Sequence, residues 1–218
     1  MFSIVKTPSI FPLLFKKYLW HFSRKDKILY LTFDDGPTAK ITPWVLTQLN
    51  NYKAKATFFC IGKNVVKNTT TFKNILTAGH AIGNHTYNHI NGLKTNTNDY
   101  LNNIDKTHRE FLKNNKSFEN KHPLLFRPPY GKCKPKQLKY LIKNVYKPVF
   151  WDVLSRDFDL NITKEECLNN VLKSVENGSI IVFHDSVKAF NKLVFVLPKI
   201  LEYFTIKGYQ FKAIKDIA

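Results

Sequence analysis

Cysteine is scarce in this sequence, with only three among 218 residues. Cys60, Cys133 and Cys167 are widely spaced and form no CxxC pair, which argues against a disulfide framework and against a zinc site made of thiolates. Cys60 lies in an apolar run and Cys167 in an expected helix, so we interpret both as buried thiols. We expect Cys133 to pack as well, with a place at the rim of a cleft as the alternative.

Long apolar runs are also missing. None approaches the ~20 residues needed to span a bilayer, and no small-residue cleavage site follows an apolar core near the N-terminus. The apolar pieces of residues 1–22 are interrupted by Pro8, Pro12, Lys16 and Lys17. The sequence therefore predicts neither a signal peptide nor a transmembrane segment, and we expect a protein that is cytoplasmic or peripheral to the cell envelope.

Arginine is rare although the chain is strongly basic. The net charge is +18 at pH 7, yet the 34 basic residues include only Arg24, Arg109, Arg127 and Arg156 as arginines. Base readout and bidentate phosphate contacts favour the planar guanidinium over the lysine ammonium. We therefore do not expect nucleic-acid binding and interpret the charge as a diffuse solvated surface. Attraction to anionic envelopes or anionic glycans remains open.

The residues that are present suffice for one globular domain. The 44% hydrophobic content, with 18 Phe and 10 Tyr, can bury a sizeable core. No internal repeat or low-complexity linker divides the chain. We expect residues 1–26 to form an N-terminal extension that packs on the domain, although Ile10 to Trp20 could lie on a surface instead.

Apolar patterns of strand and helix type alternate along the chain. The expected strands are residues 28–33, 56–61, 80–84, 123–126, 148–152, 179–183 and 209–213. The expected helices are residues 42–50, 72–76, 97–115, 135–144, 164–175 and 190–204. For the first helix we assign Thr42 as the N-cap and Pro43 to the first helical position. The alternation implies an α/β domain with a mainly parallel sheet, which can close into a barrel or wind both ways.

Residues able to do chemistry fall at or just after the carboxyl ends of the expected strands. They are Asp34, Asp35, His85, His89, Arg127, Asp152, Asp157, His184 and Asp185. In parallel α/β folds the carboxyl edge of the sheet is where sites are built. We therefore expect a functional site at that edge.

The stretch Tyr30 to Pro37 ends an apolar run with two adjacent carboxylates and a Gly-Pro turn. Neighbouring side chains of an extended chain point to opposite sides. Asp34 and Asp35 can therefore serve two different partners, one holding a metal and the other a proton. Asp-Asp-Gly-Pro is also a common sequence in solvent-exposed turns. Whether these carboxylates bind a metal therefore depends on whether the chain supplies further ligands.

His85 and His89 offer that other half. Four residues apart, they would face the same way on one helical turn and could share a metal, although histidines also serve in cores and on surfaces. With Asp35 they make two imidazoles and one carboxylate, a set that leaves open positions for water, as in catalytic zinc sites. Zinc lowers the pKa of bound water to about 7 and polarises carbonyls, so this set favours hydrolysis.

Five motifs follow one another along the chain. They are Thr-Phe-Asp-Asp-Gly-Pro at 32–37, His-Thr-x-x-His at 85–89, Arg-Pro-Pro-Tyr-Gly at 127–131, Asp-Phe at 157–158 and Ile-Val-Phe-His-Asp at 181–185. This ordered set resembles the motifs of the polysaccharide deacetylases, the family with the NodB homology domain (carbohydrate esterase family 4). The resemblance runs from about residue 28 to 213. It implies a single-domain, distorted (β/α)7-type barrel, with residues 27–218 as the catalytic domain.

The resemblance implies a role for each matched residue. Asp35, His85 and His89 would hold Zn²⁺, or another divalent metal such as Co²⁺, Ni²⁺ or Mn²⁺. Asp34 would take a proton from the attacking water, and Arg127 would pair with it and keep it ionised.

The remaining motifs imply the other parts of the site. The backbone N–H of Tyr130 would stabilise the oxyanion. His184 would protonate the leaving amine, with Asp157 orienting it and tuning its pKa. Trp151 and Val182 would wall the acetyl pocket.

Two positions depart from the family's pattern. Phe158 stands where the family usually has tryptophan, and Leu154 where it often has aspartate. Neither change removes a ligand, the base or the acid, so we expect the departures to affect substrate fit more than activity. We interpret Asp152 and Asp185 as structural.

The leading hypothesis is a zinc-dependent hydrolase that removes N-acetyl groups from N-acetylglucosamine-containing glycan, with peptidoglycan or a chitin-like oligosaccharide as the substrate class. One alternative keeps the metal site, but the bond that is hydrolysed is an O-acetyl ester or a cyclic amide. The other is a non-catalytic glycan- or nucleic-acid-binding module on a retired scaffold.

Overall fold

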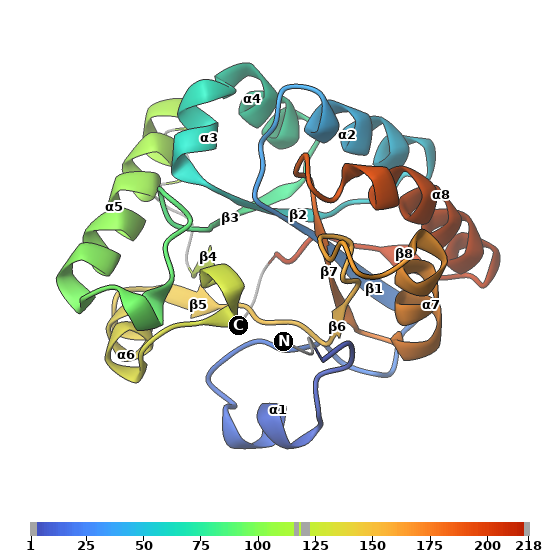
Figure 1. Cartoon of the computed structure of the whole chain (residues 1–218), viewed down its shortest axis with the longest axis horizontal. Coiled ribbons are helices and arrows are strands. Elements are labelled where there is room, and N and C mark those ends of the chain that lie inside the picture. Colours follow the sequence, from blue (N-terminus) through green and yellow to red (C-terminus); the bar gives the residue numbers. More distant parts are fainter. Residues whose placement is uncertain (1–3, 116–117, 119–122, 216–218) are drawn as a thin grey trace.

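The computed structural model describes residues 4–115, 118 and 123–215, which form a single α/β domain on a curled parallel sheet (Figure 1). The strands are β1 (Ile28–Asp34), β2 (Thr57–Cys60), β3 (Ala81–Asn84), β4 (Leu124–Phe126), β5 (Tyr146–Pro148), β6 (Val153–Leu154), β7 (Ile180–His184) and β8 (Gln210–Phe211). Their order is β5-β4-β3-β2-β1-β7-β6, with β8 paired to β1. This arrangement confirms the expected distorted barrel, in the form of a half-barrel that ends at β5 and β6.

Most of the helices cover the outer side of the curled sheet (Figure 1). They are α1 (Ile10–Leu14), α2 (Ile41–Asn51), α3 (Gly62–Lys67), α4 (Thr69–Thr77), α5 (Thr97–Asn114), α6 (Pro135–Lys143), α7 (Lys164–Ser174) and α8 (Phe190–Ile206). Short 3-10 turns occur at Gly92–Lys94 and Pro129–Gly131. Among the described residues, none of these helices is both long and apolar enough to cross a bilayer.

Local sequence signals explain where α7 and α5 begin. At α7, the Thr163 hydroxyl accepts a hydrogen bond from the Glu166 amide, and the Glu166 carboxylate accepts one from the Thr163 amide, which makes a capping box. At α5, the Asn96 side chain accepts from the Asp99 amide. These caps satisfy amides that have no partner inside the helix.

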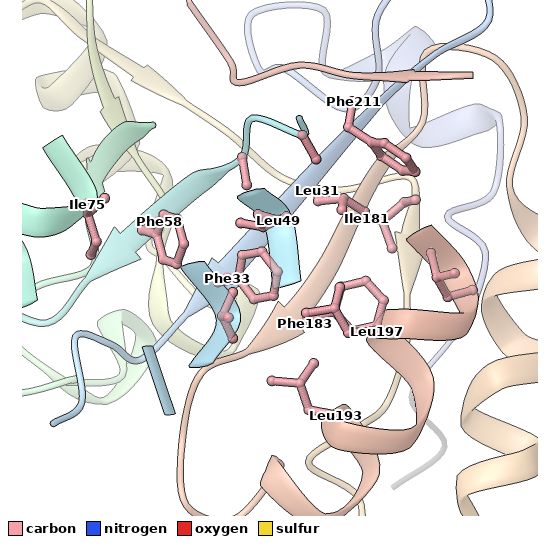
Figure 2. Packing of buried hydrophobic residues seen from close by; sticks show 14 of the residues in the cluster. Leu31, Phe33, Leu49, Phe58, Ile75, Ile181, Phe183, Leu193, Leu197 and Phe211 are labelled. Carbon is pink, nitrogen blue, oxygen red and sulfur yellow. The ribbon is translucent and has the colours of Figure 1, made fainter. Parts of the chain in front are cut away.

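The main hydrophobic core lies between β1, β2 and β7 on one side and the covering helices on the other, and its labelled side chains point toward one another in Figure 2. Phe33 stacks on Phe58 at 5.1 Å and lies 6.0 Å from Phe183, measured between ring centroids. Leu49 of α2 and Leu197 of α8 are fully buried against this layer. The packing holds β1 at the centre of the sheet.

The register of the central strands brings several chemical side chains to one edge. Asp34 of β1 pairs with His184 of β7 and with Phe59 of β2. Asn84, the last residue of β3, pairs with Phe126 at the end of β4. Because these strands are parallel, the residues that follow them emerge side by side at the carboxyl edge.

One expected strand is wrong. Residues 148–152 are not a strand, since β5 ends at Pro148 and β6 begins at Val153. The amides between them bond to separate neighbours: that of Val149 to the Phe126 carbonyl and that of Asp152 to the Ile180 carbonyl. The apolar pattern is typical of a strand, but here the chain crosses between the two edges of the half-barrel.

The expected start of the first predicted helix, which is α2 in the structure, is also wrong. α2 begins at Ile41 with Lys40 as its N-cap, so Thr42 lies inside the first turn. The Thr42 hydroxyl instead donates to the Asp185 carboxylate. We did not expect α3 either, because its six residues are too short to show a helical period.

Residues 4–20, which we name the N-terminal segment, lie along the crossing between β5 and β6. The amide of Leu154 donates to the Val5 carbonyl and that of Thr7 to the Asp152 carbonyl, both at 2.8 Å. Farther along, the Phe150 amide donates to the Leu19 carbonyl at 2.8 Å. The segment thus follows the open side of the half-barrel, where Figure 1 places α1.

Candidate active site

Asp34 and Asp35 diverge at the end of β1. Asp34 continues the extended strand and is buried, whereas Asp35 has a φ of 79°, in the left-handed region. Gly36 follows, and a Cβ there would lie 2.0 Å from an oxygen of Asp185. A glycine is therefore required next to Asp35, and the turn sends the two carboxylates toward different partners.

Arg127 is the partner of Asp34. Its guanidinium, which is fully buried, donates to Asp34 Oδ1 at 2.7 Å, to Thr32 Oγ1 at 2.8 Å and to the carbonyls of Val149 and Phe150 at 3.1 and 3.0 Å. Burial by itself raises the pKa of Asp34, but the charge and hydrogen bond of Arg127 outweigh it and the pKa ends below its ordinary value. Asp34 is therefore a carboxylate at neutral pH.

Three possible ligands converge beside this pair. Asp35 Oδ1 lies 3.2 Å from His89 Nε2 and 3.7 Å from His85 Nε2, and the ligand atoms of the three residues all lie within 4.8 Å of one another. Among the described residues, the buried Asp35 Oδ1 has no hydrogen-bond donor. A divalent cation bound by two imidazoles and this oxygen would satisfy it.

The state of His85 fits a ligand. Its Nδ1 lies 2.8 Å from the carbonyl oxygen of Arg127 and donates to it, which leaves the lone pair of Nε2 facing Asp35. Burial lowers the pKa of His85 to about 4. The imidazole is therefore neutral at pH 7, the form that binds metals.

The two histidines do not share a helical turn, so this part of the sequence interpretation is wrong. Thr86 and His89 have φ of 62° and 56° in a loop that follows β3. The amides of residues 87 and 88 donate to Asn103 Oδ1 of α5, at 2.7 and 2.9 Å. Asn103, which we did not single out, holds the loop that carries both imidazoles, and nothing in the local pattern marked it.

His184 and Asp157 form a second polar pair. His184 Nδ1 lies 2.7 Å from Asp157 Oδ1, and the His184 amide donates to Asp157 Oδ2 at 2.7 Å. Burial alone would lower the pKa of His184, but the charge and hydrogen bond of Asp157 outweigh it and raise the pKa to about 9. Phe158, where the family usually has tryptophan, packs edge-on against the His184 ring at 5.0 Å between centroids.

A cleft of about 790 Å³ opens above these groups. Its walls include Tyr130, Trp151, Val182 and Leu154. Tyr130 has a φ of 60° in the turn that follows β4, and its ring lies 4.6 Å from that of His89. The structure thus places all ten residues that we predicted for the site around one cavity or in direct contact with residues that line it.

Among the residues that we interpreted as structural, Asp152 accepts hydrogen bonds from Lys6 and Ser179 and lies 3.0 Å from an Arg24 nitrogen. Asp185 is fully buried, which raises its pKa to about 7.

The cysteines form no disulfide. Cys60 and Cys167 are buried, as expected. The Cys133 thiol donates to Gln137 Oε1 at 3.3 Å and packs beside Leu141. Packing is therefore the role that its contacts indicate.

Comparison with known proteins gives the family. Residues 22–149 match the model of the polysaccharide deacetylases. The chain belongs to this family. A peptidoglycan-N-acetylglucosamine deacetylase of Bacillus cereus is 37% identical over 201 residues, 91% of each chain. A crystal structure of a peptidoglycan N-acetylglucosamine deacetylase, in complex with a naphthalenyl N-oxidanyl-benzamide, superposes with a TM-score of 0.85 at 33% identity and covers 95% of each chain.

The same fold also occurs without activity. A family 4 pseudoenzyme from Bacillus anthracis has a TM-score of 0.77 at 22% identity, over 89% of this chain and 66% of that one. This likeness concerns the fold alone. For a polysaccharide deacetylase, activity must therefore be argued from the site residues.

The Arg127–Asp34 pair leads to a prediction about stability. Replacing Arg127 by methionine leaves the Asp34 carboxylate buried without its counter-charge, so we expect the free energy of unfolding in urea to fall by about 3–5 kcal/mol. Arg109→Met is the matched control, because Arg109 is exposed and its ion pair with Asp105 is also exposed; its expected loss is below about 1 kcal/mol. Equal losses of unfolding free energy in the two variants would contradict the larger contribution to stability that we assign to the buried Arg127–Asp34 pair.

Proposed function

We propose that this chain is a metal-dependent deacetylase that removes N-acetyl groups from N-acetylglucosamine units of peptidoglycan. The observation that carries the proposal is the convergence of three metal-ligand atoms within 4.8 Å of one another, beside a buried, ionised Asp34. The family and its peptidoglycan-acting relatives support the substrate class. A chitin-like oligosaccharide would present the same N-acetyl group.

Zinc is the metal we propose, held by Asp35, His85 and His89. The set of one carboxylate and two imidazoles, with an unsatisfied buried oxygen on Asp35, fits Zn²⁺. Co²⁺, Ni²⁺ and Mn²⁺ accept the same ligands. When bound, such an ion supplies a water of lowered pKa and polarises the acetyl carbonyl.

The other residues would handle the protons. Asp34 would accept a proton from the attacking water, since Arg127 keeps it ionised and oriented. His184 would donate a proton from Nε2 to the leaving nitrogen, because its Nδ1 is committed to Asp157. The backbone N–H of Tyr130 would stabilise the developing oxyanion.

The acetyl group itself would lie against Trp151 and Val182, which line the cleft. Leu154, at the position where the family often has aspartate, lines the same cavity. This wall is apolar and suits a methyl group. As part of the proposal, the protein works at the cell envelope, where peptidoglycan lies.

An O-acetyl esterase on the same scaffold is the enzymatic alternative. The protonated His184 favours amide hydrolysis, because an amine must be protonated to leave, whereas an alkoxide leaves more readily. A non-catalytic glycan-binding module, as on the pseudoenzyme fold, is the other alternative. The presence of proposed base, acid and ligands together argues against it.

The deciding experiment is acetate release from a panel of substrates. Purified protein is incubated with peptidoglycan, N-acetylglucosamine oligomers and acetylated xylan, with and without a chelator and with zinc added back. We expect zinc-restored acetate release from the N-acetylated glycans and little from xylan. Release from xylan alone would establish the esterase, and glycan binding without any release would establish the binding module.

The His184–Asp157 pair predicts a pH effect. His184 must be protonated to act as an acid, so kcat/KM falls as the pH rises through its pKa. Asp157→Asn removes the charge that raises this pKa, and burial then lowers it. We expect the alkaline limb of the kcat/KM profile to move down by at least ~1 pH unit. The exposed Asp105→Asn serves as control, and coincident profiles for wild type and Asp157→Asn would exclude His184 as the acid.

A further inference from the structure

The cleft extends well beyond the residues that would carry out deacetylation. Its volume of about 790 Å³ lies in the upper part of the ~300–1,000 Å³ range of pockets that enclose drug-sized ligands. It therefore has room for more than the acetyl group of one sugar. Part of the additional lining comes from the N-terminal segment, which contributes Ile4, Thr7, Pro8, Phe11 and Trp20.

This additional wall is aromatic. Trp20 stacks on Phe150 with ring centroids 4.6 Å apart, and Phe11 lies 6.0 Å from Trp20. All three rings line the cleft. The Trp20 indole N–H donates to the Phe15 carbonyl at 3.2 Å, so its polar atom is satisfied within the segment. The rings thus offer apolar surface to a ligand.

The wall has a fixed position relative to the proposed acetyl pocket. The Thr7 hydroxyl donates to the Trp151 carbonyl at 2.7 Å, and the Thr7 amide donates to the Asp152 carbonyl at 2.8 Å. Lys6 adds an ion pair to Asp152 at 2.9 Å. These contacts join the segment to Trp151 and to the next residue, Asp152. A glycan with one sugar at the metal ligands would therefore bring a neighbouring sugar toward Phe11 and Trp20.

We propose that the N-terminal segment forms a subsite for a second sugar of the glycan chain, with Phe11 and Trp20 packing against the apolar C–H face of a pyranose ring. The ligand class is a β-linked oligomer of N-acetylated hexosamines. The segment lies outside residues 22–149, the part that matches the family model, so this subsite is a property argued from this chain. The inference rests on the proposed deacetylase function and adds a preference for longer chains.

Kinetics on N-acetylglucosamine and on its oligomers of two to six units test this subsite. Phe11→Ala is expected to raise KM for the dimer and longer oligomers by about 10-fold, while KM for the monomer changes less than about 2-fold. kcat stays near the wild-type value, because a remote contact that binds ground state and transition state alike affects KM. Phe11→Tyr keeps the ring and is expected to keep the wild-type KM.

The matched control is Leu13→Ala in the same helix. Leu13 is 62% exposed and does not line the cleft, whereas Phe11 is 39% exposed and does. We expect Leu13→Ala to match wild type at every chain length, and a thermal melt of each variant checks its folding. A Phe11→Ala variant that leaves all KM values unchanged, or raises them equally for monomer and hexamer, overturns the subsite.

Binding measurements separate this inference from the proposed function. Calorimetry with the N-acetylglucosamine tetramer is run on wild type and on Phe11→Ala. If wild type releases no acetate from any oligomer, the deacetylase proposal fails; tetramer binding that Phe11→Ala weakens about 10-fold then still supports the subsite. If wild type is active and Phe11→Ala binds the tetramer equally well, only the subsite fails.

Discussion

Replacing Asp34 by asparagine is expected to lower kcat for acetate release by about 10³-fold, within the range by which general base catalysis contributes. Asparagine keeps the shape of the side chain and can still accept a hydrogen bond from Arg127, but it cannot take a proton from water. Since Asp34 is not one of the three clustered ligands, the variant should bind zinc as wild type does. The measurements are acetate release and metal content of the purified protein.

The control for this variant is Asp26→Asn, which removes a carboxylate from an exposed position. It should retain wild-type turnover. If Asp34→Asn binds zinc and keeps wild-type turnover, Asp34 is not the general base. Loss of zinc together with turnover would assign Asp34 to metal binding instead of proton transfer.

The second large effect is expected at the metal ligands. Replacing His85 by alanine removes an imidazole whose Nδ1 is anchored on the Arg127 carbonyl and whose Nε2 faces Asp35. Losing one of three protein ligands should weaken zinc affinity by more than about 100-fold. Replacing a residue that only hydrogen-bonds to a ligand already lowers metal affinity ~10–100-fold. Zinc titration by calorimetry gives the affinity, and acetate release at limiting zinc gives the functional consequence.

His80→Ala is the matched control, because the chain has a second buried histidine just before β3. Burial lowers the pKa of His80 to about 4, as it does for His85, and its Nδ1 accepts a hydrogen bond from the Ala56 amide at 3.1 Å. His80 does not belong to the ligand cluster. We expect this variant to lose some stability and to keep zinc affinity. A His85→Ala protein with wild-type zinc affinity would disprove the proposed ligand set.

The pKa values of the two histidines in the site depend on burial and on the neighbouring group, and not on residue type alone. His85 is buried and His184 is mostly buried, yet the pKa of His85 is lowered to about 4 and that of His184 is raised to about 9. The difference is the neighbour: a neutral carbonyl accepts from His85 Nδ1, whereas the Asp157 carboxylate accepts from His184 Nδ1. Two identical side chains are thereby suited to opposite tasks, one as a neutral ligand and one as an acid.

Much of the fold followed from local patterns. The helix at 97–115 was expected from its apolar spacing, and the structure confirms it as α5, with Tyr100, Ile104 and Phe111 buried on one face. The expected strand at 148–152 was wrong because an apolar run indicates that a segment is buried, but not that it pairs with a neighbouring strand. In the structure that run is buried by the N-terminal segment and by the sheet edges, and it bonds to several partners in turn.

Some contacts that build the site are not predicted by any local pattern in the sequence. The spacing of His85 and His89 indicated that they could share a metal, but the assumed helical turn is a loop with left-handed residues. Asn103, eighteen residues after His85, holds that loop in place. The aromatic wall of the N-terminal segment likewise depends on a contact between residues 130 positions apart, Trp20 and Phe150.

The sequence by itself determined the residue types of the site, their order along the chain and their positions after strands, because these depend on motifs and short-range periodicity. Through its ordered motifs it also indicated the family and, with it, a distorted (β/α)7-type barrel. Tertiary structure alone decided which of these residues meet, which histidine is neutral, and that the N-terminal segment reaches the cleft. The physical reason is that strand register, burial and charge pairing arise between segments far apart in the chain, where no local pattern records the partner.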